Sequence, residues 1–514
     1  MKFTLGIDLG TTNSVVSVYR RGNAETLSIE GHKTFPSVVS FKDKDTMLVG
    51  RAAKNRLILD PEHSVGSVKR FMGNRKRKFK IFGKEYSPIQ ISSFILKKMV
   101  EEAANELGEE VKDVIITVPA YFTDAQKEDT RDAGEAAGLN VLRLIAEPTA
   151  AAIAYGLDKG KDQTIMVYDL GGGTFDVAIL QVVKNDFNVL AVDGDSQLGG
   201  DDFDNAIVDH LLDRFKTKTG KDIKDDFSKD ALVAKQKLKE EAEKAKWELS
   251  QAQSTEINIP EIMGESIEEV LTLDQYNELI KPLLDKTIKK IHAVLKEADL
   301  SSGDINRVIL VGGSTRNTAV KEIVSKEIKE PYISDQVDEE VSHGAAILGA
   351  SLTLPEEDFT PIAVQERMAH SLGVELLDDK NRPYFTPIIP KNSEYPINQG
   401  LIAFTVRPFQ EQVLLEVFRG ESKYCKDNTK MGQLRLKISN LSKDQVPLGA
   451  IFELDADGIL KFSCVELPIN IGDEEIRDIV YAASYNKGIL DYGAVKELMA
   501  RGTVKFVETQ ITAV

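Results

Sequence analysis

Two stretches of the sequence share a pattern of residues that could bind phosphate groups. Residues 6–16 read GIDLGTTNSVV and residues 167–177 read VYDLGGGTFDV. In each, an apolar run ends at Asp-Leu-Gly, passes through small or hydroxyl-bearing residues, and continues as a second apolar run. A third stretch, residues 308–316 (VILVGGSTR), keeps the glycines without the aspartate. Single Asp-Gly turns are common in ordinary hairpins, but a matched pair with a third relative indicates a repeated binding element.

The residue types of these turns indicate their chemistry. Glycines let backbone N–H groups approach phosphate oxygens closely, and the hydroxyls of adjacent threonines add further donors. Asp8 and Asp169, at the strand ends, would repel a triphosphate, so we expect a divalent cation between carboxylate and phosphate. Two such turns that face each other would hold the phosphates of one nucleotide. The sequence contains neither a P-loop motif nor a Gly-x-Gly-x-x-Gly that opens a helix after a strand, which disfavours those two modes of binding.

These turns need a scaffold, and the chain up to residue 353 has the pattern of one. Short apolar runs that indicate buried strands lie at 3–7, 114–118, 165–168 and 308–311. Helix-like stretches lie between them at 91–107, 124–137, 231–249 and 275–295. This alternation of strands and helices predicts an α/β domain over residues 1–353.

The pattern changes beyond residue 353. Residues 354–367 contain two prolines with three acidic residues between them, which predicts an interdomain linker. The following residues alternate apolar and polar positions in short runs, and the pair Asp457-Gly458 is a strong hairpin signal because glycine accepts the positive φ of a tight turn. We therefore predict a β-sandwich or barrel over residues 368–475, followed by a short tail at 476–514.

Composition narrows the classes of function. The 514 residues are 42% hydrophobic and 29% charged, as in ordinary globular proteins, and their net charge of −17 disfavours nucleic acid as a partner. The basic run at 69–80 is interpreted as a solvated hairpin. Cys425 and Cys464 have no metal-binding spacing, so a reducing compartment is expected. The N-terminus has no signal-peptide pattern and no stretch could span a bilayer, which predicts a cytoplasmic protein without membrane contacts.

The turns belong to longer motifs, and these resemble one known family. The motifs are GIDLGTTNS at 6–14, VPAYF at 118–122, EPTAAA at 147–152, DLGGGTFD at 169–176 and LGGDDFD at 198–204. With them the chain resembles the seventy-kilodalton heat-shock chaperones, the DnaK family. The resemblance implies an α/β actin-like ATPase domain of two lobes with a duplicated core, followed by a β-sandwich peptide-binding domain. It is dense up to the predicted linker and looser beyond it.

The resemblance also implies catalytic roles for individual residues. Lys69 matches the family's catalytic lysine, which orients the attacking water and stabilises charge on the γ-phosphate; without the family it would be taken for an ordinary surface lysine. Glu147 and Thr174 would help to position that water and the phosphate, with Asp169 beside them. Asp8 and Asp169 would hold Mg²⁺ mainly through its waters, and K⁺ is a further cofactor that the resemblance allows. These assignments agree with phosphoryl transfer as a reaction of positioning and charge stabilisation.

Further contacts to ATP or ADP are implied for the turns and for one helix. They are Gly10, Thr11, Thr12, Asn13, Gly171, Gly172, Gly173, Gly199, Gly200, Asp201, Glu243, Lys246, Trp247, Ser250, Gly312, Gly313, Ser314, Arg316 and Asp338. Glu243, Lys246, Trp247 and Ser250 share one helical face, where Glu243 would bond the ribose and Ser250 the adenine. Trp247, the only tryptophan, stands where relatives have an arginine or an aliphatic residue. It could stack on the base, or it could be a packed core residue.

The second domain and the switch region match the family with departures. Val374, Leu377, Val406 and Val413 would line a groove for an extended apolar peptide, although any one of them taken alone is more often a core residue. Pro119 matches the family's switch proline, but Lys127 replaces the arginine beside it and cannot make a planar bidentate contact. The linker is less apolar than in relatives, the helical lid is missing, and Asn-Thr follows Gly-Gly-Ser-Thr-Arg where relatives have an apolar residue and a proline.

The leading hypothesis is therefore an ATP-dependent chaperone, a Mg²⁺-dependent ATPase in which nucleotide controls affinity for unfolded polypeptides. The family implies J-domain co-chaperones, contacted near Arg143, a nucleotide-exchange factor as a further partner, and a role in the stress response. One alternative is a specialised ATP-binding paralogue with weak or uncoupled peptide binding. Others are a sugar kinase or a filament-forming actin relative on the same superfold, although neither explains a β-rich second domain.

Overall fold

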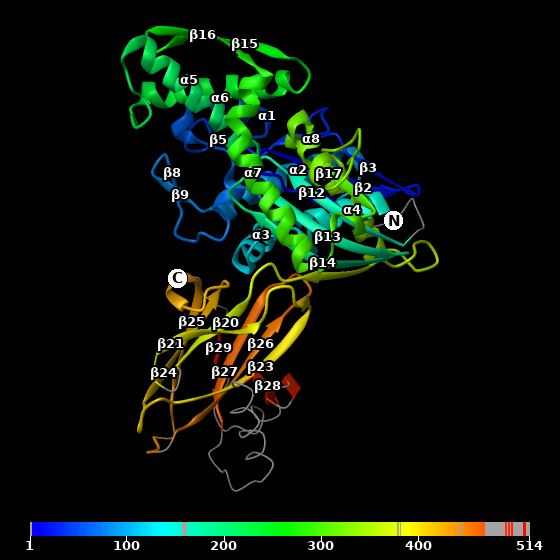
Figure 1. The fold of residues 1–514 in the computed structure, drawn as a ribbon, viewed down its shortest axis with the longest axis vertical. Helices are drawn as coiled ribbons and strands as arrows, with labels where there is room; N and C mark the ends of the chain where they lie inside the picture. Colours follow the sequence, from blue (N-terminus) through cyan, green and yellow to red (C-terminus); the bar gives the residue numbers. More distant parts are fainter. Residues whose placement is uncertain are drawn as a thin grey trace. The chain divides into compact units, whose positions relative to one another are not determined.

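The computed structural model describes residues 3–156, 162–377, 380, 382–439, 441–443 and 445–467, with short pieces at 489–490, 492–493, 495–496 and 507–509. The chain divides into two compact units (Figure 1). The first comprises Met1–Phe122 and Asp129–Val364, and the second comprises Thr123–Glu128 and Gln365–Val514. The predicted tail at 476–514 lies almost entirely outside the described residues. Each unit is described by itself below.

The first unit contains two sheets of the same topology. Five strands of each sheet have corresponding positions, in the orders β11-β10-β1-β2-β3 and β18-β17-β12-β13-β14. In each sheet, three strands that are consecutive in the chain pair antiparallel, and the first of the three also pairs in parallel with a later strand. The bounds are β1 Leu5–Asp8, β2 Asn13–Arg20, β3 Asn23–Thr26, β10 Asp113–Val118, β11 Asn140–Ala146, β12 Gln163–Leu170, β13 Phe175–Val183, β14 Asp186–Asp195, β17 Arg307–Val311 and β18 Tyr332–Ile333. The repeat read in the sequence is therefore a repeat of topology.

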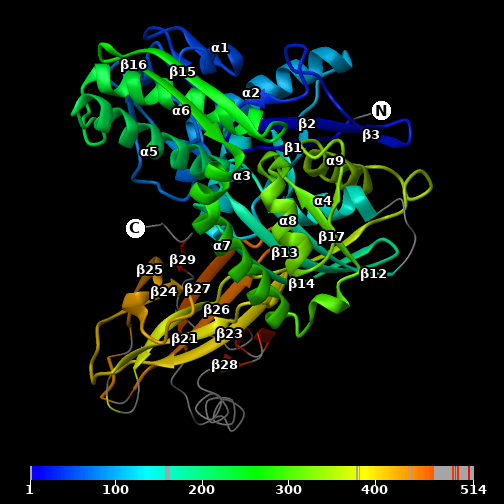
Figure 2. The same cartoon turned by 45° about the horizontal axis from the view of Figure 1, so that its top comes forward.

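The helices of this unit pack against the sheets, and small residues lie at the closest contacts. Helix α4 packs against α9 (Figure 2), and a Cβ on Gly344 of α9 would lie 1.7 Å from the carbonyl oxygen of Ala150. Gly6 of β1 approaches α9 in the same way, since its Cβ would lie 2.2 Å from the nitrogen of Ala346. The bounds are α1 Arg51–Lys54, α2 Pro88–Leu107, α3 Asp124–Ala136, α4 Glu147–Gly156, α5 Gly200–Thr219, α6 Lys229–Leu249, α7 Leu273–Glu297, α8 Thr318–Glu327 and α9 Glu340–Thr353.

Smaller elements complete the first unit. Helices α5 and α6 lie beside the hairpin of β15 and β16 (Figures 1 and 2), and their apolar faces join the core around β12 and β13. The remaining bounds are β4 Phe35–Pro36, β5 Val39–Phe41, β6 Met47–Val49, β7 Ser64–Val65, β8 Phe79–Ile81, β9 Lys84–Tyr86, β15 Ser254–Ile262 and β16 Glu265–Thr272, with 3₁₀ turns at Pro61–His63, Val68–Phe71, Ser302–Asp304 and Gly313–Arg316.

The second unit consists of antiparallel sheets. The strand orders are β21-β20-β24-β25 and β28-β23-β26-β27-β29, and both sheets contribute side chains to one hydrophobic core. Between β26 and β27, Gly458 has φ +75° and its N–H donates to Asp455, which confirms the predicted hairpin turn. The bounds are β19 Ala363–Arg367, β20 Leu372–Leu377, β21 Pro383–Ile389, β22 Glu394–Tyr395, β23 Ile397–Phe404, β24 Gln412–Arg419, β25 Thr429–Lys437, β26 Pro447–Leu454, β27 Leu460–Glu466, β28 Ile489–Leu490 and β29 Val507–Thr509, with a 3₁₀ turn at Cys425–Asp427.

Most element positions agree with the sequence pattern. The predicted strands at 114–118 and 308–311 and the helix at 231–249 are observed within two residues, as β10, β17 and α6. The predicted linker at 354–367 is irregular in its first part and forms a strand in its last part. Residues 354–362 contain no helix or strand, whereas Ala363–Arg367 form β19.

The contact of α4 with α9 generates a prediction about stability. A Gly344→Ala substitution places a methyl group against the Ala150 carbonyl, so we expect the free energy of unfolding to fall by about 1–3 kcal/mol, the typical cost of overpacking. Gly303→Ala is the matched control, because its Cβ would meet nothing closer than 3.6 Å. Urea unfolding of the full chain measures both variants. Equal stability of the two would contradict the prediction.

Candidate functional site

The three glycine-containing turns meet one another in the first unit. They follow β1, β12 and β17, and each joins the end of its strand to the next element. A Cβ on Gly172 in the second turn would lie 2.1 Å from Oγ1 of Thr12 in the first. Gly312 begins the third turn with φ +86°, and its Cβ would lie 2.4 Å from the carbonyl oxygen of Leu170. Glycine is therefore required here for close approach of one turn to another.

Gly199, Gly200 and Asp201 were predicted to contact the nucleotide. In the structure they contact the second turn. The N–H of Gly200 donates to the Gly171 carbonyl at 2.9 Å, and the N–H of Asp201 donates to the Gly172 carbonyl at 2.7 Å. Gly199 lies so close that its Cβ would be 2.6 Å from the nitrogen of Gly173. The start of α5 thus holds the turn in place.

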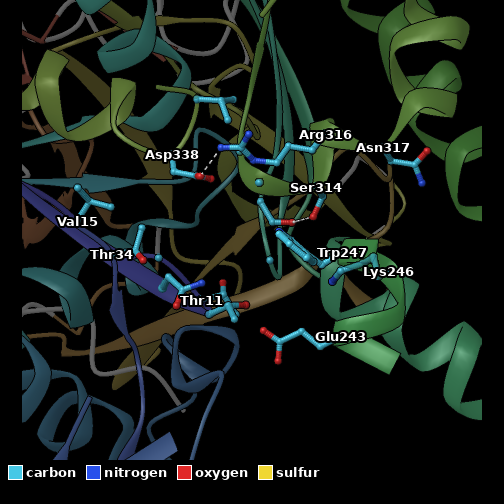
Figure 3. Close-up of a pocket in the computed structure, with 18 of the residues that line it drawn as sticks. Thr11, Val15, Thr34, Glu243, Lys246, Trp247, Ser314, Arg316, Asn317 and Asp338 are labelled. Atoms are coloured by element: carbon cyan, nitrogen blue, oxygen red, sulfur yellow. Dashed lines mark hydrogen bonds and ion pairs between the residues drawn. The ribbon is translucent and has the colours of Figure 1, made fainter. Parts of the chain in front are cut away.

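A cavity of about 860 Å³ opens in front of the turns. Its lining comes from both sheets, from the loop before α2 and from α6 (Figure 3). The predicted site residues that line it are Asp8, Gly10, Thr11, Thr12, Asn13, Lys69, Glu147, Asp169, Gly171, Gly172, Thr174, Glu243, Lys246, Trp247, Ser250, Gly312, Gly313, Ser314, Arg316 and Asp338. Residues up to 330 positions apart in the sequence are therefore brought together around one cavity.

The end of the cavity next to the turns contains a buried ion pair. Nζ of Lys69 lies 2.5 Å from Oε1 of Glu147, and both side chains are over 90% buried. Burial alone would lower the pKa of Lys69, but the negative charges of Glu147 and Asp8 outweigh it and raise this pKa, so the lysine is charged. From the sequence alone, Lys69 would be taken for a surface residue. In the structure it is a buried cation beside the turns.

More carboxylates surround this cation than it can neutralise. Burial raises the pKa of Asp8 to about 7, with Glu147 adding to the shift and Lys69 opposing it. Burial also raises the pKa of Asp169, and Glu147, Asp176 and Asp8 raise it further. A further cation beside Asp8 and Asp169 would lower these raised pKa values and favour the ionised carboxylates.

Asp176 belongs to this cluster although it was not among the predicted site residues. It stands opposite Asp169 in the pairing of β12 with β13, and it accepts a hydrogen bond from the backbone N–H of Tyr121 at 2.9 Å. Burial and the charge of Glu147 raise its pKa to about 8. Its place at the end of the DLGGGTFD motif was the available signal, because the hairpin returns position 176 to the side of position 169.

The carboxylates fit a magnesium ion that is held through its waters. Among the residues that the structure describes, no group of three or more His, Cys, Asp and Glu side chains is placed to hold a metal directly. Asp8 and Asp169 both line the cavity next to the turns, and their pKa values are raised by burial first and by the neighbouring carboxylates second. Mg²⁺ commonly binds through one or two carboxylates, several waters and substrate phosphates.

The opposite end of the cavity is formed by α6. Ser228 caps the helix by accepting from the N–H of Ala231, and an apolar stripe that includes Leu238 and Leu249 faces the core. Glu243, Lys246, Trp247 and Ser250 line the cavity from another face of the helix. Trp247 is 61% exposed, so the alternative of a packed core tryptophan is wrong.

The charged residues at this end form ion pairs with residues of other elements. Glu243 is paired with Lys54 of α1 at 2.8 Å, and Lys246 with Asp204 of α5 at 2.7 Å. Arg316 is paired with Asp338 at 2.7 Å. Lys54 was not predicted from the sequence, because no local pattern distinguishes it from the other lysines of the chain.

The predicted peptide and switch residues lie in different environments. Val374 is fully buried in the core of the second unit, so it belongs to that core rather than to an open groove. Leu377 and Val406 are 39% and 51% exposed, and Val413 packs partly against the core. Pro119 is buried. Lys127 is buried as well.

The buried carboxylates generate a prediction about pH. A carboxyl whose pKa is higher in the folded than in the unfolded chain stabilises the fold at low pH, and this contribution is lost as the pH rises through the folded pKa. We expect Asp176→Asn, which stays neutral, to gain stability relative to the natural chain between about pH 4 and about pH 8 in the absence of divalent cations.

Urea unfolding at a series of pH values, followed by the fluorescence of Trp247, measures this difference. Thr217→Ser at an exposed position of α5 is the control, because it replaces one neutral side chain by another and so changes no titratable group. A stability difference for Asp176→Asn that is independent of pH would contradict the assignment.

Among the described residues, no helix is both long and apolar enough to cross a membrane.

Comparison with known protein families agrees with this site. The family model described as "Hsp70 protein" matches residues 4–82 and 74–477, which together take in most of the first unit and the second unit as far as residue 477. Members of this family are ATPases and ATP-dependent chaperones. The chain belongs to the Hsp70 family.

Proposed function

We propose that this protein is a Mg²⁺-dependent ATPase that controls the binding of extended apolar peptides. The observation that supports it best is the meeting of the three turns around one cavity, with the buried cation of Lys69 among them. Backbone N–H groups of the first two turns and the hydroxyls of Thr11 and Thr12 would bind the phosphates of ATP.

The residues at the phosphate end have complementary roles in hydrolysis. The Lys69 ammonium, held by Glu147, would stabilise the charge that develops on the γ-phosphate and orient the attacking water. Thr174 would help to position the same phosphate, and Glu147 would accept a hydrogen bond from the water. Bound Mg²⁺, held by Asp8 and Asp169 mainly through waters, would neutralise phosphate charge, and K⁺ could add to this neutralisation.

At the other end, the face of α6 would bind the nucleoside. Glu243 would accept from the ribose hydroxyls and Ser250 from the base, while Arg316 and Asp338 would close the same end. Gly199, Gly200 and Asp201 would act indirectly, by holding the second turn through the hydrogen bonds described above. The first unit would thus be the actin-like ATPase domain.

The second unit would be a β-sandwich that binds peptide. Leu377 and Val406 are exposed apolar side chains next to loops of the sheets, and an extended segment of an unfolded protein could cover them. If ATP weakens peptide binding, peptide must weaken ATP binding by the same factor. J-domain co-chaperones near Arg143, a nucleotide-exchange factor and a cytoplasmic location complete the proposal. Pro119 and Lys127 would take part in the coupling.

The role of Lys69 can be tested by Lys69→Met. We expect ATP hydrolysis in single-turnover experiments to fall at least about a hundredfold, the typical effect of removing a donor to developing charge, while ATP binding is kept. Because removal of Lys69 leaves Glu147 buried without its partner, the double variant with Glu147→Gln is included to keep the fold. Lys76→Met, at an exposed lysine of the same loop, is the control. Unchanged hydrolysis by Lys69→Met would contradict the catalytic role of Lys69.

Peptide binding can be tested separately in the second unit. We expect Leu377→Asp and Val406→Asp to weaken binding of a fluorescent apolar heptapeptide at least about tenfold, because a charge must then be desolvated, while basal ATP hydrolysis stays unchanged. Leu59→Asp, at an apolar residue of the first unit that is 71% exposed, is the matched control. Stimulation of ATP turnover by the peptide would further support coupling. Equal peptide affinity in all variants would refute the proposed groove.

A further inference from the structure

Two buried polar side chains that line the cavity have no role in the proposed function. They are Asn317, which follows Gly-Gly-Ser-Thr-Arg at the position where the sequence departs from the family pattern, and Tyr276 of α7. We propose that these two residues recognise the edge of the base, with the Asn317 amide donating to a ring nitrogen of adenine and the Tyr276 hydroxyl accepting from its amino group. This inference rests on the proposed nucleotide binding and adds residues that determine base specificity.

The amide of Asn317 is oriented by the helix that it caps. Asn317 is the N-cap of α8, and its Oδ1 accepts a hydrogen bond from the backbone N–H of Ala319 at 2.8 Å. Its Nδ2 is buried and has no hydrogen-bond partner among the residues that the structure describes, although Asn317 lines the cavity. Because the cap engages Oδ1, the amide offers a ligand its N–H donors.

Tyr276 brings a second buried polar atom to the same part of the cavity. The residue is only 1% exposed, and its hydroxyl also has no hydrogen-bond partner within the described parts of the chain. Burial raises the pKa of Tyr276, the amide of Asn317 opposes this shift, and the charge of Asp204 adds to it. The phenol is therefore protonated, and Asn317 is its neighbour.

Unpaired polar atoms of this kind indicate a contact that a ligand completes. Buried donors and acceptors are nearly always hydrogen-bonded in native proteins, and leaving one unpaired costs free energy. Figure 3 shows Asn317 on the same side of the cavity as Trp247 and Lys246 of α6 in that view. The two unpaired atoms thus belong to the end that would bind the nucleoside, and a base placed there could pair both of them.

The two groups are complementary to adenine. The amide N–H can only donate, whereas a phenol hydroxyl can accept as well as donate. On adenine, the amino group is a donor with an acceptor ring nitrogen on either side of it, and asparagine side chains commonly recognise this edge. A site whose own polar groups are paired only by the correct ligand rejects analogues that lack a partner atom. Asn317 and Tyr276 therefore favour a base that presents this edge.

The amide contact is tested by calorimetric titration of the full chain with Mg²⁺ and ADP or its 1-deaza, 7-deaza and 3-deaza analogues. Each analogue replaces one ring nitrogen by C–H, and 3-deaza-ADP is the control ligand because its missing nitrogen does not adjoin the amino group. In the natural chain, we expect 1-deaza-ADP or 7-deaza-ADP to bind about three- to tenfold more weakly than ADP. In Asn317→Asp, which keeps the cap but removes the amide donor, we expect this ratio to fall below about twofold.

The comparison of ratios separates the contact from other effects of the substitution. The carboxylate of Asn317→Asp repels all the nucleotides alike, so this repulsion cancels in the ratio of two affinities. Asn317→Ser repeats the measurement without a new charge, because serine also caps helices. Asn306→Asp is the matched control: Asn306 is exposed, its Oδ1 also accepts from a backbone N–H, and it does not line the cavity. Its ratios should equal those of the natural chain.

The hydroxyl contact is tested in the same way with Tyr276→Phe. We expect this variant to bind ADP about three- to tenfold more weakly, and to bind purine riboside diphosphate, which lacks the amino group, as the natural chain does. Ratios for the deaza analogues that are the same in the natural chain and in both Asn317 variants would overturn the inference and leave water as the partner of the amide. A loss confined to 3-deaza-ADP would overturn it as well. Absence of ADP binding by the natural chain would instead refute the proposed function itself.

Discussion

The close approach of the turns after β1 and β12 is the constraint on which the site depends. Gly172 lies against Thr12, and Gly173 lies against Thr11, at distances that leave no room for a side chain on either glycine. The two sheets can meet in this way only because both end in the same Asp-Leu-Gly geometry, with α4 and α9 packed together between them. A cavity lined from both sheets follows from this contact.

The second constraint is electrostatic. Lys69 is one buried cation among Asp8, Glu147, Asp169 and Asp176, and burial together with the charge of Glu147 raises the pKa values of Asp8, Asp169 and Asp176. A fold that buries such an excess of negative charge is poised to bind a cation together with its anionic ligand. The same imbalance makes the end of the cavity beside the turns suited to a further cation, whereas beside α6 Glu243 and Lys246 already form ion pairs within the protein.

Much of this architecture could be predicted from the sequence. The strands and helices of the first unit were located by their hydrophobic periodicity, and the phosphate turns by the repeat of Asp, Gly and Thr around position 8 and position 169. The Asp457-Gly458 hairpin of the second unit was predicted for a local reason, the positive φ that glycine accepts. These features are local, because a few adjacent residues determine them, and therefore a single sequence reveals them.

What only the tertiary structure decided are the properties that depend on distant neighbours. The burial of Lys69 beside Glu147, the membership of Asp176 in the acidic cluster and the exposure of Trp247 come from residues far apart in the chain. Val374 looked like the other apolar residues of β20 in the sequence, yet packing places it in the core and leaves Leu377 exposed. Residue types and spacing determined which chemistry was available, while burial and pairing, which act through space, decided which side chains could carry it out.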